Sequence, residues 1–330
     1  MKNKVIETIK KYNLIENGDK LVLGVSGGPD SIAMLDILNE IKIDEKIDLK
    51  FNIVVAHINH MIREEATDDE AFVKDFCKKK SIEFYSKSID VQKLANTNKI
   101  GTEEAGRNAR YEFFDEILKK TTSNKVAIAH NKNDKAETII MNFMRGSGIS
   151  GLKGIEEKRE KYIRPLIECE RIEIEKYCEE QKLNPRIDKT NFENEYTRNK
   201  IRNIVIPYVK QEFNPNIINT LNRLSELVKE EEEYIEKQVK KSYYNLLVEE
   251  DEKQIVLDLR KFNQEEKVIK SRLVLYTIMR LFGTSKGVEK IHVEDIIKLC
   301  NNNIGNKYLT PNKNIKILVK NHKIYFLNQR

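Results

Sequence analysis

The sequence predicts an α/β protein, with a doubly wound and mostly parallel sheet followed by a smaller, mainly helical domain. In the first part of the chain, short apolar segments rich in β-branched residues alternate with segments of helical periodicity, a pattern typical of βαβ units. After Pro207 the segments are mostly helical, and the last, 307–327, alternates like a terminal β-hairpin. The predicted domains are residues 1–212 and 213–330.

The elements of the first domain are predicted in chain order from their periodicity. Residues 1–20 form a charged amphipathic segment, which predicts a helix. Strands are expected at 83–89, where apolar residues alternate, and in three clearer apolar runs, at 21–25, 51–57 and 125–130. Because ligands bind beyond the carboxyl ends of such strands, the polar residues ending the three clear runs are candidate site residues: Ser26, His57 and His130.

The second domain is predicted from three helical stretches and the terminal hairpin. The helical stretches are residues 216–247, 267–282 and 292–299. The acidic run Glu230–Glu233 is interpreted as a solvated helix face. We expect this domain to select the substrate and the first domain to carry the chemistry.

Composition excludes several classes of protein. The 59 Lys and Arg residues against 53 Asp and Glu give a net charge of +6, which suits a polyanionic partner without demonstrating one. The four cysteines form no CxxC pair, so neither a disulfide framework nor a zinc site is expected. No apolar run approaches the ~18 residues of a membrane span. These features indicate a reduced, soluble, cytoplasmic protein with no membrane partner.

The first motif, Ser-Gly-Gly-Pro-Asp-Ser, lies between the first strand and a helix expected to begin near Ser31. Its glycines, Gly27 and Gly28, let backbone N–H groups converge on an anion, and the hydroxyls of Ser26 and Ser31 add donors. Asp30 would repel a phosphate unless it holds Mg²⁺. A tight turn with Ser31 or Asp30 as the helix N-cap is the structural alternative.

This motif, Ser26–Ser31 with Pro29 at its variable position, resembles the PP-loop of the ATP-pyrophosphatase superfamily. The resemblance implies a Rossmann-like fold, cleavage of ATP between its α and β phosphates, and adenylation of an oxygen on the substrate. ATP and Mg²⁺ are the implied cofactors. No lysine follows the glycines, so the Walker pattern does not fit.

Two further motifs follow the second strand and open the helix after residue 101. His57 and His60 lie in AHINHMIR and can bind phosphate or terminate the strand. Arg107 and Arg110, in EEAGRNARY, share a helix face and are suited to phosphate contact. An ion pair between Glu103 and Arg107 is the structural alternative.

The fourth motif, AHNKNDKAET, places Asp134 and Glu137 on one face at the start of a helix. These carboxylates, near His130, can bind the ammonium group of a lysine or a second metal ion. A capping box with Asp134 at N-cap and Glu137 at N3 is the structural alternative. The RGSG turn that begins at Arg145 is a further anion-binding candidate.

The fifth motif runs from RPL (164–166) through DKTN (188–191) to RNKIR (198–202). Arg198 and Arg202 share a helix face, and the segment from Arg198 to Lys210 has four basic residues and no acidic ones. Its composition makes it a candidate RNA-backbone contact, with a solvated helix as the alternative.

The five motifs, in this order over about residues 20–210, resemble the tRNA(Ile)-lysidine synthetases. The resemblance implies ligation of free L-lysine to C2 of the wobble cytidine of tRNA(Ile) with anticodon CAU, through an adenylated cytidine. The implied catalytic residues are Asp30, Arg110, His130, Asp134 and Glu137, with Asp30 and Asp134 also as metal ligands. The implied nucleotide-binding residues are Ser26–Ser31, His57 and Arg107, and the implied RNA-binding residues are Arg145, Arg198 and Arg202.

The sequence departs from this family at two positions and leaves other functions open. Asn131 and Asn133 stand where the family usually has His and Asp, which predicts weaker metal binding if the missing Asp is a ligand. A PP-loop tRNA thiolase and a nucleotide-binding RNA adaptor without turnover are the alternatives. The sequence does not fix the oligomeric state, and a homodimer remains open.

Overall fold

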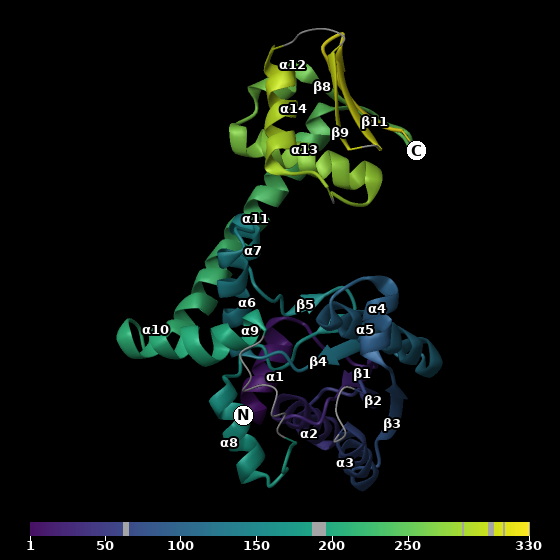
Figure 1. Ribbon diagram of the computed structural model, residues 1–330, viewed down its shortest axis with the longest axis vertical. Helices are drawn as coiled ribbons and strands as arrows, with labels where there is room; N and C mark the ends of the chain where they lie inside the picture. Colours follow the sequence, from purple (N-terminus) through teal and green to yellow (C-terminus); the bar gives the residue numbers. More distant parts are fainter. Residues whose placement is uncertain (62–65, 187–195, 286, 303–306, 313, 330) are drawn as a thin grey trace. The chain divides into compact units, whose positions relative to one another are not determined.

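The computed structural model describes residues 1–61, 66–186, 196–285, 287–302, 307–312 and 314–329 (Figure 1). The chain divides into two compact units, Met1–Glu226 and Leu227–Arg330. This division falls within helix α11 (Ile217–Leu246) rather than at 212–213. The first turns of α11 belong to the first unit because Ile218 is buried there and Asn222 donates a hydrogen bond to the Lys132 carbonyl.

The first unit is built on a six-stranded sheet with the order β3-β2-β1-β4-β6-β5. All neighbouring strands are parallel except β5 and β6, which confirms the predicted mostly parallel sheet. The strands are β1 (Lys20–Gly24), β2 (Asn52–Asn59), β3 (Glu83–Ser88), β4 (Lys125–Ile128), β5 (Lys158–Arg159) and β6 (Tyr162–Ile163). Gly24 pairs with both Ala56 and Ile128, so β1, β2 and β4 deliver their following loops to one edge of the sheet.

Helices cover both faces of this sheet because alternate strand residues face opposite sides. Leu21 and Leu23 pack against one set of helices: α1 (Lys2–Lys11), α2 (Pro29–Ile43), α3 (Ala66–Lys79) and α8 (Arg171–Glu180). On the other face, Val22 packs against α5 (Thr102–Thr121). Helix α4 (Val91–Asn98) precedes α5 in the chain. A side chain at Gly24 would meet the Phe114 ring at 2.5 Å, so the glycine permits the close approach of α5.

A second group of helices in this unit packs around Ala136 and Ile201. It contains α6 (Lys132–Met144), α9 (Thr197–Lys200), the π-helical turn η2 (Ile201–Val205), α10 (Ile206–Glu212) and the start of α11. The short helix α7 (Gly148–Gly151) follows α6. This packing brings the segment after residue 196 against the helix that begins beyond β4.

The second unit contains a five-stranded antiparallel sheet with the order β7-β8-β11-β10-β9. The predicted terminal hairpin is confirmed as β10 (Ile315–Lys320) and β11 (Lys323–Asn328). The sequence missed β7 (Leu247–Glu250) and β8 (Gln254–Asp258), and within the segment 307–327 it did not separate β9 (Lys307–Asn312) as a third strand. Beside the sheet the unit has α12 (Leu259–Gln264), α13 (Lys267–Phe282) and α14 (Lys290–Asn302).

One charge in the acidic run of α11 is not solvated, which corrects the interpretation of that run. Glu232 is buried and forms a two-bond ion pair with Arg272 of α13, whereas its neighbours Glu231 and Glu233 are exposed. The run therefore has a structural member inside it. In the described residues, no helix combines the length and apolar character needed to cross a membrane.

Candidate functional site

The loop between β1 and α2 is held in shape by the hydroxyl of Ser31. The Ser31 Oγ accepts hydrogen bonds from the backbone N–H groups of Ser26 (3.1 Å) and Gly27 (3.2 Å) and donates one to the Gly28 carbonyl (3.0 Å). Gly27 has φ +95°, a conformation that favours glycine. The loop is therefore folded back on the first turn of α2.

Helix α2 begins earlier than expected, so neither Ser31 nor Asp30 is its N-cap. The N-cap is Gly28, and Pro29 occupies N1, where its missing N–H costs no helical hydrogen bond. The N–H groups of Asp30 and Ser31 belong to the first turn, which leaves them without partners inside the helix. They point the positive end of the helix dipole toward the loop, a favourable arrangement for an anion.

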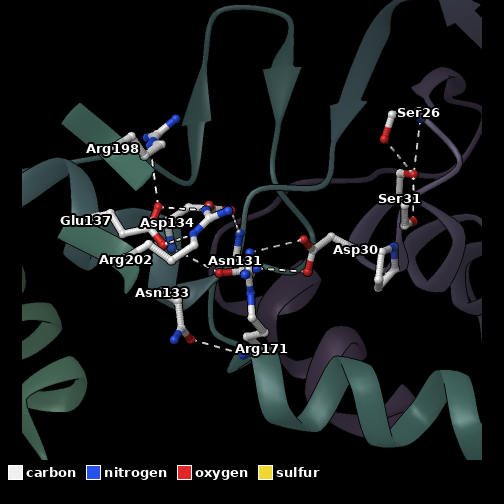
Figure 2. A network of polar contacts seen from close by, with 12 residues as sticks. Ser26, Asp30, Ser31, Asn131, Asn133, Asp134, Glu137, Arg171, Arg198 and Arg202 are labelled. Carbon is white, nitrogen blue, oxygen red and sulfur yellow. Dashed lines mark hydrogen bonds and ion pairs between the residues drawn. The ribbon is translucent and has the colours of Figure 1, made fainter. Parts of the chain in front are cut away.

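Asp30 is linked to the start of α6 across the edge of the sheet (Figure 2). Its Oδ1 accepts a hydrogen bond from Asn131 Nδ2 at 2.8 Å, and its Oδ2 lies 3.9 Å from a guanidinium nitrogen of Arg171. Burial and the nearby carboxylate of Asp134 raise the pKa of Asp30 to about 6, although Arg171 and Asn131 oppose the shift. A buried carboxyl group beside a second carboxylate is a donor set expected at a cation site.

Asn131 caps α6, which corrects the expected capping box of Asp134 and Glu137. Asn131 Oδ1 accepts from the Asp134 N–H, and Asp134 Oδ2 accepts from the Asn131 N–H, both at 3.0 Å. The helix starts at Lys132, so Asn131 is the N-cap and Asp134 is at N3. The fully buried Asn131 therefore uses one side of its amide to cap α6 and the other to hold Asp30.

Glu137 lies one turn further along α6 and binds Arg202 through both of its oxygens. Arg202 donates from Nε at 2.6 Å and from a terminal nitrogen at 2.8 Å, and that nitrogen also donates to Asp134 Oδ1 at 3.0 Å. The Glu137 side chain is 2% exposed and that of Arg202 16%. Burial raises the pKa of Glu137 despite this opposing contact, and the carboxylates raise that of Arg202.

Arg198 adds a second cation to this carboxylate cluster, defined here as Asp30, Asp134 and Glu137. It donates to Thr138 Oγ1 at 2.7 Å, and its Nε lies 3.5 Å from Glu137 Oε2. Arg198 and Arg202 were expected to meet an RNA backbone, but in this structure both face the carboxylates (Figure 2). Arg202 sits in the π-helical turn η2, a kind of irregularity that often marks functional sites.

The histidines at the strand ends are held in their neutral forms. His57 Nδ1 lies 2.9 Å from the Val25 carbonyl, which can only accept, so this nitrogen carries the proton. His130 Nδ1 accepts from Arg164 Nε at 3.2 Å. Burial lowers the pKa of His57 and lowers that of His130 to about 4, with Arg164 adding to the second effect.

His60 and the two arginines of α5 lie on the other side of the strand end. A terminal nitrogen of Arg110 lies 3.4 Å from His60 Nε2, and burial with this cation lowers the pKa of His60 to about 4. Arg107 is exposed and lies 5.6 Å from the centre of the Tyr111 ring. In the described part of the chain no ion pair joins Arg107 to Glu103, so that structural alternative is not observed.

Two residues of the site were missed or not singled out in the sequence. Arg171 begins α8, and its backbone N–H donates to Asn133 Oδ1 at 3.0 Å, which fixes α8 beside α6. Arg164 orients His130, and its only sequence signal is the RPL motif. Sequence periodicity indicates neither the contact of Arg171 with Asp30 nor that of Arg164 with His130, because each joins residues far apart in the chain.

Other expected site residues lie apart from the carboxylate cluster or outside the described residues. Arg145 is exposed at the C-terminal end of α6, roughly 16 Å along the helix from Asp134 at 1.5 Å per residue. Arg63 of the second motif and the DKTN segment, 188–191, fall outside the described residues. Among the described residues, no group of three or more His, Cys, Asp or Glu could hold a metal ion unaided.

Comparison with known proteins gives consistent matches. The family model described as "PP-loop domain" matches residues 1–209. A tRNA(Ile)-lysidine synthase of Clostridium acetobutylicum is 47% identical over 94% of this chain and 67% of its own length. That of Clostridioides difficile is 44% identical over 99% of the chain and 70% of its own length, and that of Geobacillus kaustophilus is 32% identical over 96% and 68%. The chain thus spans about two thirds of the length of these relatives.

A solved structure supports the fold of the first unit. The U34-tRNA thiolase NcsA from Methanococcus maripaludis has a TM-score of 0.57 and 21% sequence identity, covering 69% of this chain and 77% of its own. At this identity the likeness concerns the fold alone.

Proposed function

The chain belongs to the tRNA(Ile)-lysidine synthase family, and on that premise we propose how its site joins L-lysine to the wobble cytidine of tRNA(Ile) with anticodon CAU. It is a PP-loop enzyme that uses ATP and acts on tRNA. The observation that carries the proposal is the juxtaposition of the Ser26–Ser31 loop with the carboxylate cluster at one sheet edge. In the proposal, the loop binds ATP, and the carboxylates of α6 bind the amine of lysine.

In this proposal the triphosphate lies against the loop and the N-terminus of α2. Ser31 is buried and shapes the loop through its hydroxyl. Ser26 is exposed, and in the proposal its hydroxyl turns from Ser31 Oγ, 3.2 Å away, to a phosphate oxygen. The first-turn N–H groups of α2 supply further donors. His57 supports the loop from below by donating to the Val25 carbonyl, and Arg107 and Arg110 supply positive charge from α5.

The residues at the sheet edge fit Mg²⁺. The Asp134 carboxylate helps raise the pKa of Asp30, and a divalent cation held by the two carboxylates would relieve that repulsion. Two carboxylates are the usual protein share of a Mg²⁺ site, in which phosphates and water complete the coordination. When bound, Mg²⁺ neutralises charge on the phosphates. Asn131 holds Asp30 in place for this role.

The chemistry then has two balanced steps. The C2 carbonyl oxygen of the cytidine attacks the α phosphorus and pyrophosphate leaves, a step that needs positioning and charge neutralisation. The ε-amine of lysine next attacks the activated C2, and AMP leaves as the C–O bond breaks. The amine must first lose a proton, and Glu137 or Asp134 is the proposed acceptor, because both carboxylates are buried and already bind a cationic side chain.

The cysteines do not support the thiolase alternative. Cys77, Cys169, Cys178 and Cys300 are all buried, and burial raises the pKa of Cys178 to about 11 and those of the others to about 12. Thiols of this kind are protonated at neutral pH and poor nucleophiles. Cys178 lies near the loop, but it donates to the Pro29 carbonyl and is closed to solvent.

Pyrophosphate release measured with each substrate omitted in turn tests the proposal. We expect release that requires tRNA, because the attacking oxygen belongs to it. We expect the adenylated cytidine to be converted to lysidine only when lysine is present. Release without tRNA, or transfer that requires a sulfur donor instead of lysine, would contradict the proposal.

A further inference from the structure

The helix that carries Arg202 into the site continues as an exposed apolar surface, which we call the α10 patch: Ile204, Tyr208 and Phe213. Their exposed fractions are 52%, 59% and 73%. The rings of Tyr208 and Phe213 meet edge to face with centroids 5.9 Å apart, which leaves outer ring surface open to solvent. Single exposed apolar residues are ordinary, but aromatic neighbours on one short helix are not.

The charges around the patch favour an anionic partner. Lys200 is exposed one turn before Ile204 and Lys210 follows Tyr208, while Glu212, beside Phe213, is the one acidic residue of 198–213. Within the described residues, neither lysine forms an ion pair, and no acidic residue lies between Arg198 and Lys210. Aromatic rings interleaved with free lysines form the surface that binds single-stranded nucleic acid, because bases stack on the rings while the lysines contact phosphates.

The position of the patch identifies which nucleotides reach it. Arg202 binds Glu137 and Asp134, where the reacting amine is proposed to lie, and Tyr208 is six residues further along the same helical segment. At about 1.5 Å per residue, this separation is roughly 9 Å. Successive bases in a strand are about 3.4 Å apart, so the patch lies two or three nucleotides from the base being modified.

We propose that the α10 patch is a stacking platform for the unpaired anticodon-loop nucleotides next to the modified cytidine, with Lys200 and Lys210 contacting their phosphates. The inference rests on the proposed function and adds a binding surface to it. Tyr208 and Phe213 supply the rings, and Ile204 extends the apolar floor. Unpaired bases are available for such contacts because they are not buried in a duplex.

Binding of an RNA hairpin that carries the CAU anticodon loop, without ATP or lysine, tests the platform directly. Tyr208→Ala and Phe213→Ala should each weaken binding roughly 5- to 140-fold, the range measured for loss of one stacked base. Tyr208→Phe should bind like wild type because the ring remains. Tyr234→Ala is the matched control, since Tyr234 is 64% exposed but follows the acidic run Glu230–Glu233.

Two further measurements separate this inference from its alternatives. In lysidine formation, the alanine variants should raise the KM for tRNA while kcat and the KM values for ATP and lysine stay unchanged. Lys200→Ala and Lys210→Ala should each reduce the slope of log affinity against log salt by about 0.7. Unchanged hairpin binding in Tyr208→Ala and Phe213→Ala overturns the platform. A change in oligomeric state without loss of RNA binding overturns it too, and assigns the patch to a second copy of the chain.

Wild-type protein that binds the hairpin but forms no lysidine contradicts the proposed function and leaves the platform standing. Wild-type protein that forms lysidine, together with patch variants that bind RNA normally, supports the proposed function and contradicts the platform. The two proposals therefore fail separately.

Discussion

Replacement of Glu137 by alanine should damage both the fold and the use of lysine, for one structural reason. Glu137 binds Arg202 through two hydrogen bonds of 2.6 and 2.8 Å, and both side chains are largely buried. In Glu137→Ala the Arg202 guanidinium keeps a single carboxylate partner, Asp134. A buried cation is then left incompletely paired at the position proposed to receive the ammonium group.

The cost follows from the class of interaction that is broken. Removal of one partner from a buried ion pair costs about 3–5 kcal/mol, and the remaining bond to Asp134 places this case near 3 kcal/mol. Loss of a helix-capping contact costs only about 0.5–2 kcal/mol, and Glu137 is not part of the capping box. The free energy of unfolding therefore distinguishes the two interpretations of Glu137.

The assay compares Glu137→Ala with Glu157→Ala. Glu157 pairs with Lys135 of the same helix at 3.1 Å, and both side chains are buried, so this variant also breaks a buried pair but outside the carboxylate cluster. Denaturant unfolding should show losses of similar size. Only Glu137→Ala should raise the KM for lysine, and ATP binding should change little in either. A loss below about 1 kcal/mol in Glu137→Ala, or equal lysine defects in the two variants, would refute this reasoning.

The remaining predictions concern four other positions. Asp30→Ala should abolish pyrophosphate release with no loss of folded structure by circular dichroism; release near the wild-type rate contradicts its role toward Mg²⁺. Asn131→Ser should keep the stability of α6, because serine caps helices well, yet weaken pyrophosphate release, whereas Asn131→Ala should lose both; equal activity in Asn131→Ser and wild type removes the link to Asp30. The pKa of His60 is about 4 in the folded protein and 6.5 in the unfolded chain, so the unfolded chain binds this proton first as pH falls. The contribution of neutral His60 to the free energy of unfolding is therefore complete above pH 6.5 and declines toward pH 4. His60→Asn should flatten that decline when unfolding is measured against pH. A chain truncated after Glu226, where the first unit ends, should bind ATP but lose most tRNA affinity; equal affinities and salt slopes for the two chains would move recognition into residues 198–210.

The sequence was informative where local pattern decides structure. The continuous apolar run at 21–25 predicted β1, and the glycines with Pro29 predicted a strand–loop–helix junction at that place. The two terminal strands of the hairpin followed from the alternation of apolar residues within 307–327. Each of these features depends on neighbours in the chain, which is why it could be inferred without the fold.

The parts that were missed depend on contacts between distant residues. Asp134 and Glu137 have the spacing of a capping box, but the helix starts at Lys132, so Asn131 is its N-cap. The packing of η2 against α6 pairs Arg202 with Glu137, a contact that composition does not indicate, and the RNA contact of Arg202 stays a prediction. Strand β7 has four residues, of which the last two are charged, and β8 has five residues with the continuous apolar run Ile255–Leu257, so no alternation marks either strand.

Nucleoside analysis of the tRNA tests the central claim most directly. tRNA(Ile) with anticodon CAU is incubated with the protein, ATP, Mg²⁺ and isotope-labelled L-lysine, then digested and analysed by mass spectrometry. The account predicts a labelled lysidine in place of the wobble cytidine, formed only when ATP and lysine are both present and absent with Asp30→Ala. An unmodified cytidine despite pyrophosphate release, or a thiolated base at that position, would contradict it.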